Sequence, residues 1–305
     1  MKYLEIFLSI LIISFWILMN ALLVSREAEL DKLGQFKNGI EGYLASGSWR
    51  ESWMSIRHKG KRIGYTGYTV EKLYIDGGNE YHIGIETVYR GRVPVPSLLA
   101  RFLPDNRQFE ITGRLVLAES MKPLSLRMDL SLVTLRAGAE AARASFLLVG
   151  RADGNHFVVE LYHEEYEPPL LAVKLPGDKL TLSNGLAPTI PIADMEPGKS
   201  YRVPVFDPLS SLGFGSESAT VRVLRKEPRK IDGVFVDTSV VETLYGSRTS
   251  TSWVTSDGEV VRQELGPPLD LVLVKTVNRK RAVAELEKTA PATGTTRKTL
   301  ETPDD

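Results

Sequence analysis

The sequence predicts a mainly β protein with one large, curved antiparallel sheet of half-barrel type, preceded by an N-terminal transmembrane helix. Three observations carry this prediction. Apolar and polar side chains alternate with period two over many short stretches, as in strands that have one buried and one solvent-exposed face. Turn-forming residues such as Asp153-Gly154-Asn155 separate these stretches. The uncharged run Ile6–Val24 precedes them all.

Composition narrows the classes of function. The chain has 305 residues, with 38 Lys plus Arg and 38 Asp plus Glu, so no net charge attracts nucleic acid. There is no cysteine. Disulfides, a thiol nucleophile, thiolate zinc sites and a lipid-modified cysteine are therefore excluded.

Ile6–Val24 spans roughly 28 Å as a helix, close to the hydrocarbon thickness of a bilayer. A cleavable signal peptide is the alternative, but Leu23-Val24-Ser25 is a poor cleavage site. We therefore expect an uncleaved anchor. Charges flank it on both sides and give no orientation. We expect a single-pass protein of the bacterial inner membrane with its bulk in the periplasm, because signal anchors commonly deliver β-rich bodies outward.

The expected domains are a membrane anchor (1–25), a helical connector (26–50), an antiparallel β domain (51–288) and a disordered tail (289–305). The connector has a weak helical stripe with three interrupting glycines, and its heptads are too few to favour a dimerising coiled coil. The tail is polar and cannot bury enough surface to become ordered.

The β domain opens with a hairpin, Glu51–Ile75, around the basic turn Lys59-Gly60-Lys61. Its apolar positions change from odd numbers (Ile63, Tyr65) to even numbers (Tyr68, Val70). A change of parity inside a strand requires an extra residue, and we place that bulge at Gly67.

Later stretches predict further strands. In Leu124–Leu132 the even positions are all apolar and should share one buried face. A region rich in proline, 168–208, is expected to be irregular apart from a short strand at Leu171–Leu175. Further strands are expected at Ala219–Leu224 and onward to Leu271–Lys275, followed by a short helix over Asn278–Lys288.

Three groups of residues carry a family resemblance: Glu51–Met54 with Lys61–Tyr65, Glu196–Tyr201 with Phe206–Pro208, and Thr251–Val254 with Asp257–Val260 and Leu271–Val274. In this order they resemble the β-rich domain that precedes the transglutaminase-like core of some bacterial envelope proteins. A more distant similarity is to the half-barrel sheets of lipoprotein carriers. The resemblance implies a fold and an envelope location. It implies no catalysis, because the transglutaminase-like core needs a cysteine and this chain has none.

No catalytic, cofactor-binding or metal-binding residue is predicted. The four histidines are His58, His82, His156 and His163, and the last two should point to opposite faces of one strand. No Gly-x-Ser-x-Gly elbow is present. Trp53 and Trp253 are expected to pack at strand ends, with ligand stacking as the alternative. The basic hairpin tip His58–Arg62 is expected to be solvated, with contact to a headgroup or polymer as the alternative.

Three functions remain open. The first is a tethered binding or scaffold module whose sheet holds an acyl chain or a partner's segment, and this is the function we expect. The second is an accessory subunit of a separately encoded envelope enzyme or transporter. The third is a hydrolase with a dispersed site. A buried apolar pocket, an exposed apolar patch and a cleft of convergent titratable groups would distinguish them in that order.

Overall fold

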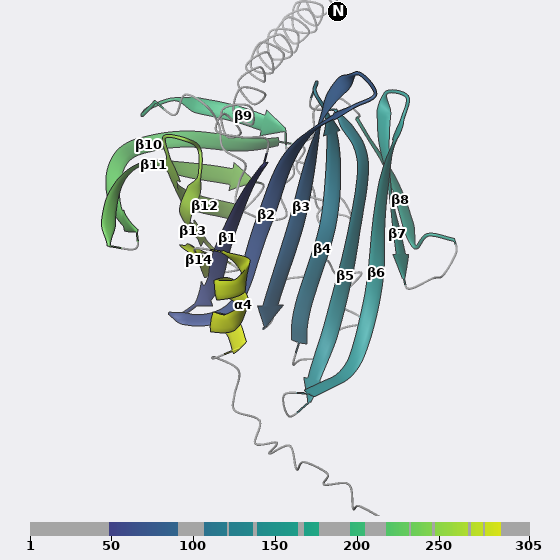
Figure 1. Cartoon of the computed structure of the whole chain (residues 1–305), viewed down its shortest axis with the longest axis horizontal. Helices are drawn as coiled ribbons and strands as arrows, with labels where there is room; N and C mark the ends of the chain where they lie inside the picture. Colours follow the sequence, from purple (N-terminus) through teal and green to yellow (C-terminus); the bar gives the residue numbers. More distant parts are fainter. Residues whose placement is uncertain are drawn as a thin grey trace, which may run out of the picture.

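In the computed structural model, residues 49–90, 107–120, 122–136, 139–163, 168–176, 196–204, 218–231, 233–245, 248–267, 270–276 and 278–287 are described. They form one open antiparallel sheet of 14 strands in the order β8-β7-β6-β5-β4-β3-β2-β1-β14-β13-β12-β11-β10-β9. Figure 1 shows that this sheet twists and curves, so that β10 and β11 run across the direction of β2 to β6. The expectation of a mainly β protein with one large antiparallel sheet is confirmed.

The strands are β1 (Trp49–His58), β2 (Lys61–Ile75), β3 (Gly78–Arg90), β4 (Arg107–Ala118), β5 (Pro123–Arg136), β6 (Ala139–Asp153), β7 (His156–His163), β8 (Leu171–Pro176), β9 (Ser200–Pro204), β10 (Ser218–Ile231), β11 (Val234–Tyr245), β12 (Arg248–Thr255), β13 (Val260–Leu265) and β14 (Leu271–Thr276). The short helix expected near the C-terminal end is α4 (Arg279–Glu287). Among the described strands, β1 and β14 are the one pair of neighbours that do not follow each other in the sequence.

The two faces of the sheet differ in what they bury. One face, here called the inner face, carries a cluster of buried side chains over β2 to β7 and a second cluster over β1 and β10 to β14. The opposite, outer face carries α4, which packs on β1, β2 and β14 and covers Trp53 and Tyr65. Figure 1 shows α4 in front of these strands. Burial on both faces of β1 and β2 makes this hairpin the centre of the molecule.

The prediction of a bulge at Gly67 is wrong, although β2 contains a bulge elsewhere. Gly67 pairs in regular register with Trp53, and the register shifts where Ile56 pairs with Gly64 and Arg57 with Arg62. Ile63 is therefore the extra residue. Every residue of β2 from Gly64 to Tyr68 is buried, because α4 covers one face while the inner cluster covers the other. Periodicity fades where both faces are buried, and this led to the wrong position.

The apolar face of β5 is confirmed except at its first residue. Leu126, Met128, Leu130 and Leu132 are buried in the inner cluster, whereas Leu124 is exposed. The register between β4 and β5 shifts beside Leu124, since Val116 pairs with Ser125 and Leu117 with Pro123. This bulge turns Leu124 out of the face that its spacing predicts.

Two strands differ from expectation. β9 lies within the region expected to be irregular, and β10 continues through Ile231 rather than ending at Leu224. Within the described residues, no helix is long and apolar enough to cross a membrane. The expected anchor Ile6–Val24, residues 26–48 of the expected connector (26–50) and the tail 289–305 lie outside these residues. The last two residues of that connector, Trp49 and Arg50, belong to β1 rather than to a helix.

Candidate functional site

The inner face contains polar side chains in an otherwise apolar row. Ser252 of β12 pairs with Gln263 of β13, and the two are flanked by Val241 of β11 and Leu273 of β14. All four side chains are buried. We call Ser252 and Gln263 the inner polar pair.

Two oxygen atoms of the inner polar pair are buried without a hydrogen-bond partner among the described residues. They are Ser252 Oγ and Gln263 Oε1, and Ser52 Oγ on the same face of β1 is a third such atom. The nearby Thr66 and Thr87 hydroxyls, in contrast, bond each other at 2.7 Å. A buried polar atom without a partner costs about 1–3 kcal/mol, so each is an exception that calls for a reason.

The chemistry available at this place is binding rather than proton transfer. A serine hydroxyl can donate and accept, and the Gln263 carbonyl oxygen accepts an N–H or O–H. Neither group exchanges protons near neutral pH. Lys275, which lies on the inner face of the neighbouring β14, forms an ion pair with Glu259. The pair therefore suits a guest with an apolar body and one polar group.

The histidines do not converge. His82 contacts Glu80 Oε2 at 2.9 Å and lies against Arg114. The His163 ring packs on Phe146, with 4.9 Å between centroids. His156 and His163 begin and end β7, so they face opposite sides about 24 Å apart. Across the described ranges, no three His, Asp or Glu side chains are placed to hold a metal ion.

Trp53 is a packing residue, but it lies within β1 rather than at its end. Its Nε1 donates to Glu51 Oε2 at 2.8 Å, and its ring lies 6.3 Å from that of Tyr65. Ala282 and Leu286 of α4 belong to the same buried cluster. Trp53 is thus part of the apolar surface on which α4 packs.

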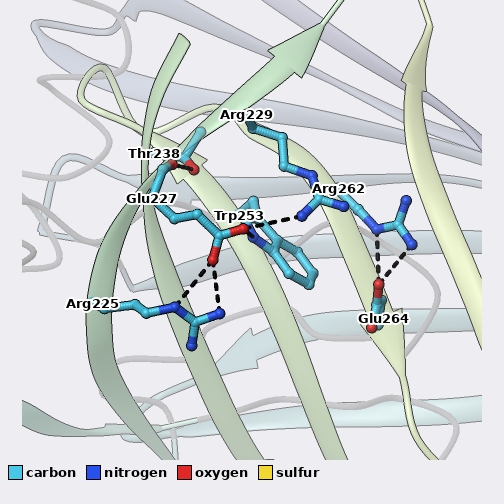
Figure 2. A network of polar contacts seen from close by, with 7 residues as sticks. All are labelled: Arg225, Glu227, Arg229, Thr238, Trp253, Arg262 and Glu264. Carbon is cyan, nitrogen blue, oxygen red and sulfur yellow. Dashed lines mark hydrogen bonds and ion pairs between the residues drawn. The ribbon is translucent and has the colours of Figure 1, made fainter. Parts of the chain in front are cut away.

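Trp253 lies on the outer face within β12, beneath a network of charges (Figure 2). The Arg229 guanidinium lies 4.4 Å from its ring centroid and that of Arg262 lies 5.7 Å away. Its Nε1 donates to Glu227 Oε1 at 3.3 Å. Glu227 in turn accepts from Arg225 at 2.7 Å. Hydrogen bonding to Arg225 is the main cause that lowers the pKa of Glu227.

The geometry of this network argues against ligand stacking. Trp253 is only 6% exposed, and arginines lie over its ring. It also packs with Val240, Val261 and Ile231 in a separate cluster. The network therefore fastens the long β10–β11 hairpin to β12 and β13.

The basic hairpin tip is partly engaged in structure. Lys59 and Gly60 form the turn with φ of 48° and 79°. The Arg62 side chain is 7% exposed and pairs with Glu285 of α4. Burial is the main cause that lowers the pKa of Arg62. Lys59, Gly60 and Lys61 are exposed, and they are the part of the tip that a headgroup or polymer can contact.

A clasp between α4 and the sheet was not foreseen from the sequence. Arg279 donates from Nε and Nη2 to the two oxygens of Glu86, each at 2.7 Å, and the Tyr65 hydroxyl donates to Glu86 Oε1 at 2.8 Å. Burial raises the pKa of Glu86, but the bonds from Arg279 and Tyr65 outweigh it and lower the pKa overall. Burial, followed by the bond to Glu86, raises the pKa of Tyr65. Glu86 and Arg279 are too far apart in the sequence for any local pattern to join them.

Comparison with known proteins adds no relative: the chain matches no model of a protein family, no curated protein and no solved structure.

Proposed function

We propose that this protein is a membrane-anchored, non-catalytic binding module of the bacterial envelope. In this proposal Ile6–Val24 is the anchor and the inner face of the sheet is the binding surface. The guest is an acyl chain or an apolar segment of a partner that carries one hydrogen-bonding group. That group meets the inner polar pair.

One observation carries the proposal: in the part of the chain that the structure describes, Ser252 Oγ and Gln263 Oε1 are buried without hydrogen-bond partners in a row of apolar side chains. An interior selected for stability alone would place apolar residues here, because replacing an unpaired buried polar group with an apolar one removes its desolvation cost. A guest that donates to Gln263 and exchanges a hydrogen bond with Ser252 supplies the missing partners.

The second candidate function is an accessory subunit of a separate envelope enzyme or transporter. It is favoured by Val234 and Phe235 at the start of β11, which are 65% and 71% exposed. Exposed large apolar side chains of this kind are typical of surfaces that contact a partner.

Native mass spectrometry of the full chain, extracted with a mild detergent, tests the first function. We expect part of the protein to carry the added mass of a bound lipid or apolar peptide. Ser252→Ala and Gln263→Leu should reduce this population, while Thr251→Ala, on the outer face of the same strand, should leave it unchanged. Empty protein in every sample, or equal loading of parent and variants, would contradict binding at the inner face. Capture of a folded protein subunit instead would support the second function.

A further inference from the structure

The connected ends of β2 and β3 project beyond their neighbours as a two-stranded ribbon. The pairing of β2 with β1 ends where Glu71 meets Trp49, and the pairing of β3 with β4 ends where Glu80 meets Ala118. Residues 74–79 continue past both positions. Figure 1 shows this hairpin at the top of the view, near the connection between β6 and β7.

The ribbon ends in exposed apolar side chains on both of its faces. Tyr74 is 75% exposed and Ile75 is 38% exposed. Adjacent residues in a strand point to opposite sides, so the two side chains flank the ribbon. A flat protein partner would cover one face and leave the other in water. Insertion of the tip into a soft apolar medium would cover both.

Further exposed apolar residues lie at the same end of the strands. Leu124 is exposed at the start of β5, and Trp49, half exposed, begins β1. Antiparallel pairing places both at the end where the β2–β3 hairpin turns. The chain also enters the sheet here, from a preceding stretch that includes the uncharged run Ile6–Val24.

We propose that this end of the sheet, with Tyr74 and Ile75 at its tip, rests in the interface of the lipid bilayer that holds the anchor. This rests on the anchor in the proposed function. Trp and Tyr are the residues enriched at membrane interfaces, because their rings are apolar and their polar groups remain hydrated. The anchor holds the tip close to the bilayer, so a weak insertion is sufficient.

Charge favours the apolar interface over an anionic surface as the source of binding. Lys72 and Lys122 at this end are offset by Asp76 and Glu119. Contact should therefore persist at high salt and require no excess of anionic lipid, unlike attraction by a basic patch.

Single cysteines offer a direct test, because the chain has none of its own. Ser120→Cys places a fluorescent label in the exposed turn after β4, at the proposed membrane end. Thr249→Cys places one at an exposed position at the opposite end of the strands. The full chain is reconstituted into vesicles of phosphatidylethanolamine and phosphatidylglycerol that carry nitroxide-labelled lipids. We expect quenching of the label at position 120 and none at 249.

The tip itself is tested by Tyr74→Ser with Ile75→Ser in the Ser120→Cys protein, which should lose the quenching while the protein remains in the membrane. Persistence of quenching in that variant would overturn the role of the tip. An unquenched label at 120 in protein that resists carbonate extraction would overturn the proposal and leave the anchor intact. Quenching at 120 in protein released by carbonate would support the tip and contradict the anchor. A third label, at Asp237→Cys, lies near Phe235 in the β10–β11 hairpin. Quenching of this label, with none at position 120, would show that the β10–β11 hairpin faces the bilayer instead.

Discussion

The indole ring of Trp53 lies directly against Gly67, its pairing partner on the neighbouring strand. A Cβ atom at position 67 would lie 2.2 Å from Trp53 Cε3, far inside any real contact. Gly67 is therefore present because it leaves room for the ring. Trp53 and Tyr65 form the apolar surface on which α4 packs. The contact between Trp53 and Gly67 therefore couples the first hairpin to α4.

Gly67→Ala should displace Trp53 and reduce the free energy of unfolding by about 1–3 kcal/mol, as overpacked cores do. Chemical denaturation measures the change. Gly78→Ala is the matched control in the same hairpin pair, because its Cβ would meet nothing nearer than Ile75 O at 4.0 Å. Equal stability of the parent and Gly67→Ala would show that the ring has another place to lie.

Arg229 and Trp253 should be energetically coupled. A double-mutant cycle of Arg229→Leu and Trp253→Leu should give a coupling of about 0.5–1 kcal/mol, as expected for a partly exposed cation–π pair. The control is a second cycle, of Arg151→Leu and Trp253→Leu, because Arg151 pairs with Glu160 on a distant strand. That cycle should be additive, and additivity in the first cycle as well would remove the stack as a source of stability.

The clasp at Glu86 should make stability depend on pH. The pKa of Glu86 in the folded protein is lowered by its bonds to Arg279 and Tyr65, against the opposing effect of burial. A lowered folded pKa means that the contribution is complete above the unfolded glutamate pKa and is lost as pH falls through the folded value. The difference in unfolding free energy between parent and Glu86→Gln should therefore shrink in acid.

Denaturation at several pH values measures this difference. In an Arg279→Met background the pH dependence of the Glu86→Gln difference should be weaker, since the largest cause of the lowered pKa is gone. A difference that is constant with pH, or that grows in acid, would contradict the direction stated for Glu86.

Period-two alternation predicted most of the strands because most of them bury one face and solvate the other. It failed where that condition fails. The later half of β10 is charged and contains Pro228, yet it pairs with β11 throughout, and on its outer face Arg229 lies over Trp253. A single strand's pattern does not include such a partner.

The candidate site was hidden for a related reason. In the sequence Ser252 stands beside the large apolar side chain of Trp253, and no local pattern marks the serine as an inner-face residue. The structure has Ser252 on the inner face and Trp253 on the outer face, and both are buried. The serine becomes notable only when register places it beside Gln263 in an apolar row.

The central claim is that the inner polar pair is kept for a guest. The most direct test is the unfolding temperature of delipidated protein with and without oleamide, whose amide can pair with Gln263 while its chain contacts the apolar row. A ligand that binds only the folded state raises this temperature. We predict that oleamide raises the unfolding temperature of the parent more than methyl oleate does, since the ester has no hydrogen-bond donor. Without ligand, Gln263→Leu should be at least as stable as the parent. With oleamide, the unfolding temperature of this variant should not rise. Equal oleamide shifts in parent and variant, or none in either, would contradict the claim.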